Sequence, residues 1–149
     1  GYGQQAQYFI RKFQAQFENL LVVAPEGMHR FYLQGSAGRV GASWMTKEAR
    51  EDDISDNIDW LTTLDQQVSE TYQPKRKIVL GFSQGGATAA RWYHKGVINF
   101  EAMILWACVF PPDLSAEDEI KNANNQYFVI GDEDQYYDEV AQDSLVKFI

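Results

Sequence analysis

A serine stands between glycines in the stretch LGFSQGG, residues 80–86, directly after an apolar, β-branched run. Residues Gly81-Phe82-Ser83-Gln84-Gly85 follow the pattern Gly-x-Ser-x-Gly, which between a strand and a helix forms a nucleophile elbow. This sharp turn lifts the serine hydroxyl clear of the sheet, and the glycines avoid collisions that side chains would cause there. The backbone N–H of Gln84, at the helix start, can donate to a developing oxyanion. The pattern therefore predicts Ser83 as a nucleophile.

Two other interpretations of this stretch are weaker. Gly-x-Ser-x-Gly can arise by chance in a chain with 11 glycines, but a strand before it and a helix after it argue against chance. Residues 81–88 also read G-x-x-x-x-G-A-T, which differs from a phosphate-binding P-loop at Ala87, where the lysine should stand. Without the lysine that reaches the terminal phosphates, we do not expect nucleotide binding.

A serine hydroxyl needs a general base near neutral pH, usually a histidine held by a carboxylate. On a fold with this elbow the chain order is serine, then Asp or Glu, then histidine. The run Asp132-Glu133-Asp134 follows the apolar stretch QYFVIG, which places it at the sheet edge where Ser83 is expected. Spacing alone does not choose among the three carboxylates.

The chain has two histidines, and both precede Asp134. His94 lies 11 residues after Ser83, roughly 16 Å along a helix, so we expect it at the far end, as a surface residue or a C-terminal helix residue that interacts with the last carbonyls. His29 is expected at the same sheet edge as Ser83, within a long loop. We favour an ordinary loop residue over a general base as its role. We therefore expect the triad histidine in a segment that follows Ile149.

Apolar residues at helical spacing alternate with short continuous apolar runs, as in a parallel sheet covered by helices on both faces. The chain opens on a glycine-rich turn with no strand before it and closes on a helical pattern with no strand after it, so a strand is expected to be missing at each end. We predict one incomplete α/β domain over residues 1–149. The expected elements are helices at 8–20, 46–72 (capped by Thr46), 84–94 and 137–148, strands at 19–25, 77–80, 102–109 and 126–131, and a long surface loop at 25–46.

Composition excludes several classes of function. A formal net charge of −8, with 13 scattered Lys and Arg residues, argues against nucleic-acid binding. No window reaches the ~18 apolar residues of a membrane span, and no charged-then-apolar leader opens the chain. The single cysteine, Cys108, has apolar neighbours and is expected to be a buried structural thiol, which agrees with a cytoplasmic location. No His/Cys/carboxylate cluster has metal-ligand spacing.

Several motifs occur in order along the chain: GYGQQ, APEG, ASWM, LGFSQGGATAARW and GDEDQYY. With them, the chain resembles the phospholipase/carboxylesterase family of α/β-hydrolases, which includes the acyl-protein thioesterases. GYGQQ is similar to the end of the family's His-Gly-x-Gly turn, LGFSQGGATAARW to its elbow and following helix, and GDEDQYY to its acid loop. The resemblance covers residues 1–138.

The resemblance implies roles for particular residues. Ser83 would be the nucleophile, and Asp134, the third carboxylate of the acidic run, would be the triad acid. The backbone N–H groups of Tyr2 and Gln84 would form the oxyanion hole. Trp44 would lie near the acyl or alcohol pocket, with a packing anchor as the equal alternative.

The activity that the resemblance implies is hydrolysis of a small carboxylic ester or thioester through an acyl-enzyme, with neither metal nor cofactor. WACVFPP stands where the family commonly has a Ser-Gly pair, so a narrower or differently shaped pocket floor is expected. The alternative is a hydrolase-like domain that binds an ester or acyl ligand without turning it over, since neither histidine of the 149 residues is well placed.

Overall fold

A three-stranded parallel sheet is the central element of the protein. The computed structural model describes residues 1–108, 110–114 and 125–131. The strands β3 (Ile78–Phe82), β4 (Ala102–Trp106) and β5 (Gln126–Val129) lie in that order. The register aligns Phe82 with Trp106 and Trp106 with Val129, so the carboxyl ends of all three strands meet at one edge. The predicted strands in this part of the chain are confirmed.

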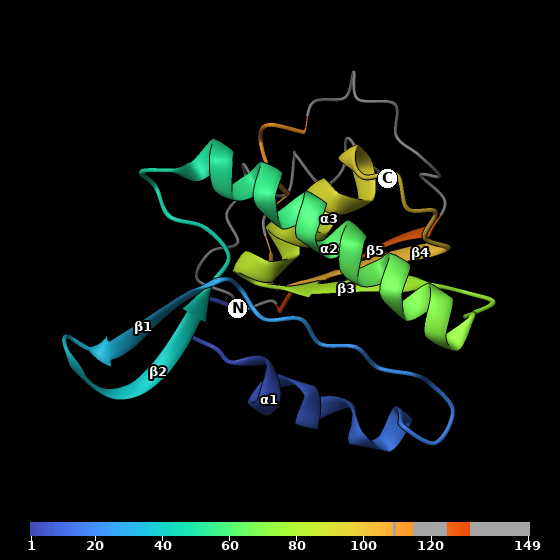
Figure 1. Ribbon diagram of the computed structural model, residues 1–149, viewed down its shortest axis with the longest axis horizontal. Helices are drawn as coiled ribbons and strands as arrows, with labels where there is room; N and C mark the ends of the chain where they lie inside the picture. Colours follow the sequence, from blue (N-terminus) through green and yellow to red (C-terminus); the bar gives the residue numbers. More distant parts are fainter. Residues whose placement is uncertain (109, 115–124, 132–149) are drawn as a thin grey trace.

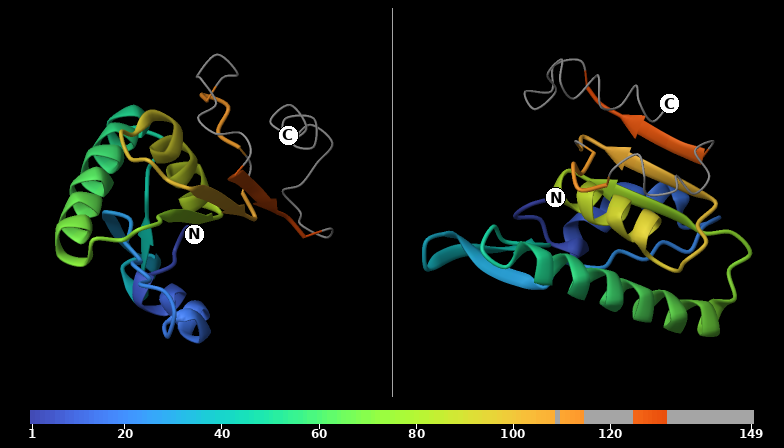
Figure 2. Two further views of the ribbon diagram at one scale, coloured as in Figure 1. Left: turned by 90° about the vertical axis from the view of Figure 1, so that its right-hand side faces the viewer. Right: turned by 90° about the horizontal axis from the view of Figure 1, so that it is seen from above.

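Helices lie on both faces of this sheet (Figures 1 and 2). α3 (Gln84–Lys95) packs directly on β3 and β4, and α2 (Arg50–Tyr72) packs against α3. α1 (Ala6–Phe9), which continues as a 3-10 helix over Ile10–Gln16, lies on the other face, where the Phe9 and Phe82 rings stack with centroids 5.8 Å apart. The α/β fold expected from the sequence is therefore present.

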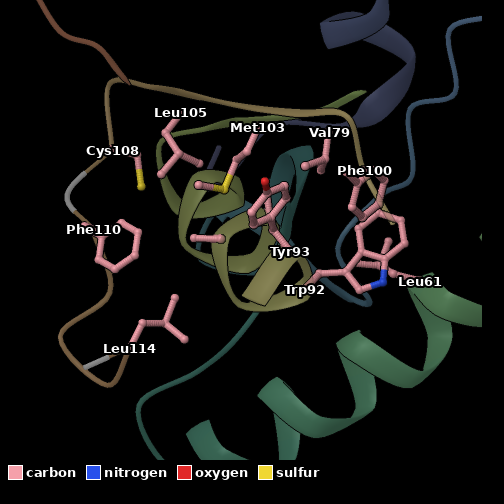
Figure 3. Close-up of a cluster of buried hydrophobic side chains, with 12 residues drawn as sticks. Leu61, Val79, Trp92, Tyr93, Phe100, Met103, Leu105, Cys108, Phe110 and Leu114 are labelled. Atoms are coloured by element: carbon pink, nitrogen blue, oxygen red, sulfur yellow. The ribbon is translucent and has the colours of Figure 1, made fainter. Parts of the chain in front are cut away.

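The hydrophobic core lies between the sheet and the helices α2 and α3 (Figure 3). Val79 of β3 and Met103 and Leu105 of β4 are buried in it, because alternate side chains of a strand point to the same face. The indole N–H of Trp92 donates to the Thr62 hydroxyl at 3.1 Å and so ties α3 to α2. The remaining core residues are Leu61, Ala89, Ala90, Tyr93, Phe100, Cys108, Phe110 and Leu114.

The other face of the same strands is partly open to solvent. Ile78 of β3, Trp106 of β4, and Tyr127 and Val129 of β5 are exposed there. Within the described residues, helix α1 therefore covers only part of this face. α1 meets this face at Phe82 in β3, whereas β4 and β5 lie farther from it (Figure 2).

Residues 25–46, expected as a surface loop, form an antiparallel hairpin instead. β1 (His29–Gln34) pairs with β2 (Ala37–Ser43), and the hairpin projects from the rest of the fold (Figure 1). Two of the glycines that suggested a loop have left-handed backbone at the tip of the hairpin: Gly35 in the turn has φ 60°, and Gly38 near the start of β2 has φ 84°. Glycine adopts these left-handed values without steric cost, so the pattern of a loop and that of a hairpin turn coincide.

Residues 19–25, expected as a strand, contain no strand. Leu20, Leu21 and Val23 in this segment are exposed, which agrees with the lack of a pairing partner. The helix expected at 8–20 is also shorter and tighter than predicted, because α1 begins at Ala6 and its 3-10 continuation ends at Gln16.

The start of α2 differs from the prediction as well. Its N-cap is Ala49 rather than Thr46, and no side chain caps it. Thr46 is held by the helix instead, since its N–H donates to Asp53 Oδ2 at 2.7 Å. The apolar side of α2 faces inward, with Ile54 and Leu61 buried. α3 was expected at 84–94 and is observed at Gln84–Lys95; the helix expected at 137–148 lies outside the described residues.

Candidate active site

Ser83 lies at the carboxyl edge of the sheet, between the end of β3 and the start of α3. Its backbone has φ 54° and ψ −127°, a conformation that costs a non-glycine residue roughly 1–3 kcal/mol and marks functional turns. The Ser83 N–H donates to the Trp106 carbonyl at 2.9 Å, and its own carbonyl accepts from the Gly86 N–H at 2.8 Å. The side chain is half-buried. The serine is thus held in a strained turn and is not enclosed.

Close packing explains the glycines around the serine. A Cβ at Gly81 would lie 2.5 Å from Gly86 Cα, and a Cβ at Gly86 would lie 2.5 Å from Cys108 Sγ. Both distances are too short for real atoms. β3 and α3 can therefore meet this closely only when position 81 lacks a side chain, and Cys108 can pack on the start of α3 only when position 86 lacks one.

The N-terminus lies near the end of β3 and the start of α3 (Figure 1), and Gly1 contacts the serine. A Cβ at Gly1 would be 3.2 Å from Ser83 Cβ. The Gly3 N–H donates to the Ala42 carbonyl at 2.8 Å, which ties this turn to β2. Tyr2, the residue between them, has its ring 5.0 Å from that of Phe31 in β1. The hairpin therefore supports the turn that carries the Tyr2 N–H.

The side chain of Gln84 makes four hydrogen bonds to one distant segment. Its Oε1 accepts from the Trp44 N–H at 2.9 Å and from the Ser43 hydroxyl at 3.2 Å. Its Nε2 lies 3.0 Å from Ser43 Oγ and donates to the Met45 carbonyl at 3.2 Å. Sequence reasoning considered only the backbone N–H of Gln84 and missed both this role and Ser43, since no local pattern links positions 40 residues apart.

Trp44 packs over the elbow. A Cβ at Gly85 would meet Trp44 Nε1 at 3.2 Å, and the Trp44 ring lies 6.1 Å from that of Trp60. Trp44 and Gly85 also line a cavity of about 540 Å³ between α2, α3, β3 and residues 19–25. The packing alternative for Trp44 thus has a direct structural basis, and the side chain is also next to the elbow.

The family model described as Phospholipase/Carboxylesterase matches residues 1–149, the whole chain. The chain belongs to this family of α/β-hydrolases. Comparison with curated proteins gave no significant match. Membership shows a hydrolase of the phospholipase/carboxylesterase kind, and the strained Ser83 stands where the elbow of this family was expected from the sequence.

His29 of this phospholipase/carboxylesterase family member is the first residue of β1 in the hairpin, and its side chain is paired with α2. Its Nε2 lies 2.8 Å from Asp53 Oδ1. Asp53 is buried, which alone would raise its pKa, but hydrogen bonds from the Thr46 N–H and from His29 outweigh burial and hold the pKa below its usual value. His29 makes no hydrogen bond to Ser83 within the described residues.

His94 lies in the last turn of α3, as one of its two predicted positions had it, and the alternative of a surface position is wrong. Its side chain is buried near the end of α3, with ring centroids 5.1 Å from Tyr93 and 5.7 Å from Phe110. The sequence placed it at the far end of the helix from Ser83, which agrees with its position. Burial arises because the chain after β4 returns over this end of α3.

The acidic run that contains Asp134 lies outside the described residues. Gly131, the last described residue before it, follows β5 at the carboxyl edge of the sheet. Cys108 is buried, and burial raises the pKa of its thiol to about 11, so the thiol is protonated at neutral pH. This favours the predicted structural role over a nucleophilic one.

Within residues 1–108, 110–114 and 125–131, no group of three or more His, Cys, Asp or Glu side chains is arranged to hold a metal ion. In that same part of the chain, no helix has the length and apolar character needed to cross a membrane.

Proposed function

We propose that this member of the phospholipase/carboxylesterase family hydrolyses carboxylic esters, and thioesters as chemically related substrates, through an acyl-enzyme on Ser83. A histidine takes the Ser83 proton as Oγ bonds to the substrate carbonyl carbon, and the carbonyl π electrons move to oxygen. Asp134 orients this histidine. Collapse of the tetrahedral intermediate restores the carbonyl and expels the alcohol or thiol, which takes the proton. A water molecule then attacks the acyl-enzyme by the same steps and releases the carboxylic acid from Ser83.

The Tyr2 and Gln84 N–H groups stabilise the oxyanion. Gln84 is the first residue of α3, and the first N–H groups of a helix have no intrahelical acceptor. Tyr2 is held beside Ser83 by the contact at Gly1 and the hydrogen bond from Gly3 to Ala42. Each such donor contributes roughly 3 kcal/mol to transition-state stabilisation.

A single observation carries the proposal: Ser83 has a strained positive φ at the carboxyl edge of a parallel sheet, with the Gly1–Gly3 turn against it. Strain of this kind persists only where the surroundings fix it, and it gathers at catalytic turns.

The experiment measures hydrolysis of p-nitrophenyl butyrate and of a butyryl thioester by the full-length protein, comparing wild type with Ser83→Ala. We expect Ser83→Ala to lower kcat at least about a thousandfold. Ser36→Ala, in the exposed hairpin turn, is the matched control and should keep wild-type activity. Retained turnover in Ser83→Ala would contradict the proposal, and a wild type that binds the ester without turnover would favour the non-catalytic alternative.

Trp44 borders the acyl or alcohol pocket in this proposal, because it covers the elbow at Gly85. Replacing it with alanine should change the ratio of kcat/KM for octanoyl and butyryl esters. Trp60→Ala removes the ring partner of Trp44 without removing the contact at Gly85, and serves as control. An unchanged ratio in Trp44→Ala would leave Trp44 as a packing anchor only.

A further inference from the structure

The two proposed oxyanion donors come from opposite parts of the chain, so something must fix the distance between them. Tyr2 belongs to the turn at the start of the sequence, and Gln84 begins α3. Residues 41–45, at the end of β2 and directly after it, contact the Tyr2 turn at Gly3 and contact the Gln84 side chain. This stretch is called the 41–45 segment below.

On one side, the 41–45 segment holds the Tyr2 turn. The Ala42 carbonyl accepts the Gly3 N–H at 2.8 Å. A Cβ at Gly41 would lie 2.8 Å from both Gly3 Cα and the Gly3 carbonyl oxygen, so the two backbones are in close contact. If the turn moved away from β2 it would lose the hydrogen bond, and if it moved closer its backbone would collide with Gly41.

On the other side, the same segment is bound by the Gln84 side chain. The amide oxygen accepts from the Trp44 N–H, and the amide nitrogen donates to the Met45 carbonyl. The amide nitrogen also donates to the Ser43 hydroxyl oxygen. Ser43 is buried, with 4% of its surface exposed. Only a side chain with an acceptor and a donor on one carbon can serve an N–H and a carbonyl in this way.

The 41–45 segment is also held from behind by α2. Asn57, which is 1% exposed, donates from Nδ2 to the Trp44 carbonyl at 2.6 Å. Both polar groups of the Trp44 backbone are therefore fixed, one by α3 through Gln84 and the other by α2. A segment held on several sides is a rigid connection rather than a flexible loop.

We propose that the side chain of Gln84 is a positioning residue, which locks the 41–45 segment to the elbow and thereby sets the separation of the Tyr2 and Gln84 N–H groups. This inference rests on the proposed function. Removing the amide leaves both N–H groups in place but loosens the distance between them. Because the oxyanion forms only in the transition state, loosening should lower kcat more than it raises KM.

The test compares wild type, Gln84→Met, Ser43→Ala and the double variant of the full-length protein, with kcat and KM measured for p-nitrophenyl butyrate. We expect Gln84→Met to lower kcat about tenfold or more while KM changes less than about threefold. Ser43→Ala should have a smaller effect, because Gln84 keeps its bonds to Trp44 and Met45. The double variant should be no worse than Gln84→Met, since the two act through one contact. Gln66→Met, on the exposed side of α2, is the matched control.

Unchanged kcat in folded Gln84→Met, or additive effects in the double variant, would overturn the inference. If Gln84→Met fails to fold, Gln84→Glu decides, because it keeps an acceptor for the Trp44 N–H but loses the donor to the Met45 carbonyl; wild-type kcat in that variant contradicts the proposal. Labelling by a fluorophosphonate separates the two proposals. A wild type that is not labelled at Ser83 overturns the proposed function, whereas a labelled wild type with an equally fast Gln84→Met overturns only the positioning role.

Discussion

Gly1 lies directly against Ser83, close enough that a Cβ at Gly1 would be 3.2 Å from the serine Cβ. The turn at the start of the chain thus contacts the turn at Ser83, although more than 80 residues separate them in the sequence. Behind that contact, β2 binds the first turn through the hydrogen bond from Gly3 to Ala42. The hairpin that sequence patterns did not reveal is therefore part of the support for the proposed active site.

Gly41→Ala should impair catalysis while the fold survives. The new Cβ would lie 2.8 Å from backbone atoms of Gly3, so the Tyr2 turn must shift away from β2. A displacement near 1 Å at a catalytic group can cost up to roughly 100-fold in rate, and we expect kcat to fall at least about tenfold. Gly35→Asn is the control, because that position is open and asparagine tolerates its positive φ. Equal kcat in Gly41→Ala and wild type would show that the turn is not held by β2.

Ser83→Gly should be more stable than Ser83→Ala. Both variants remove the hydroxyl, but only glycine relaxes the strain at φ 54°. The relief, roughly 1–3 kcal/mol, exceeds the extra unfolded-state entropy of glycine, so we expect a difference of about 1 kcal/mol. Urea unfolding measures it, and a Ser83→Ala variant at least as stable as Ser83→Gly would argue against strain at the elbow.

The Arg91–Asp113 pair should make stability depend on pH in acid. Arg91 is buried and donates from Nε and Nη2 to the two Asp113 oxygens at 2.8 and 2.7 Å. These bonds hold the pKa of Asp113 far below its ordinary value. A lowered carboxyl pKa contributes stability that is full above the unfolded pKa, about 4, and is lost as pH falls toward the folded pKa.

Asp113→Asn leaves the Arg91 charge buried without its carboxylate and should cost about 3 kcal/mol at pH 7. The Tm difference between wild type and Asp113→Asn should be constant from pH 7 to pH 5 and shrink below about pH 4. Calorimetry across this range checks it. A Tm difference that does not shrink in acid would contradict the assignment. Glu51→Gln is a suitable control, because its ion pair with Arg50 is exposed and should contribute little.

His29→Ala should leave kcat/KM of the full-length protein within a few-fold of wild type. Its Nε2 is paired with Asp53, and its role in the described structure is to bind the hairpin to α2. Ester hydrolysis by purified His29→Ala measures the effect. A thousandfold loss would show that His29 is the general base after all.

The sequence predicted best the parts of the fold that carry a strong local signal. The tight turn at Ser83 has close-packed glycines on both sides, and the strands β3, β4 and β5 are continuous apolar runs. The parallel arrangement of these strands follows from the alternation of strands and helices along the chain. The hairpin was missed because glycines at its turn break the alternation that marks a strand. Periodicity cannot separate such a hairpin from a loop.

The support of the site could not be predicted from local patterns at all. The bonds from Gln84 to Ser43 and Met45, and from Asn57 to the Trp44 carbonyl, join residues that are distant in sequence. Asn57 is polar within a helix and appears in a pattern as a solvent-facing residue, yet it is 1% exposed. Burial of a polar side chain depends on which backbone group it meets, and only the folded chain decides that.

The central claim is that the Ser83 hydroxyl is an activated nucleophile, and covalent labelling tests it most directly. The full-length protein is treated with a fluorophosphonate at neutral pH, and the intact mass and the labelled peptide are read by mass spectrometry. The account predicts one adduct per chain, on the peptide that contains Ser83, and none in Ser83→Ala. An unlabelled wild type, or an adduct that persists in Ser83→Ala, would contradict it.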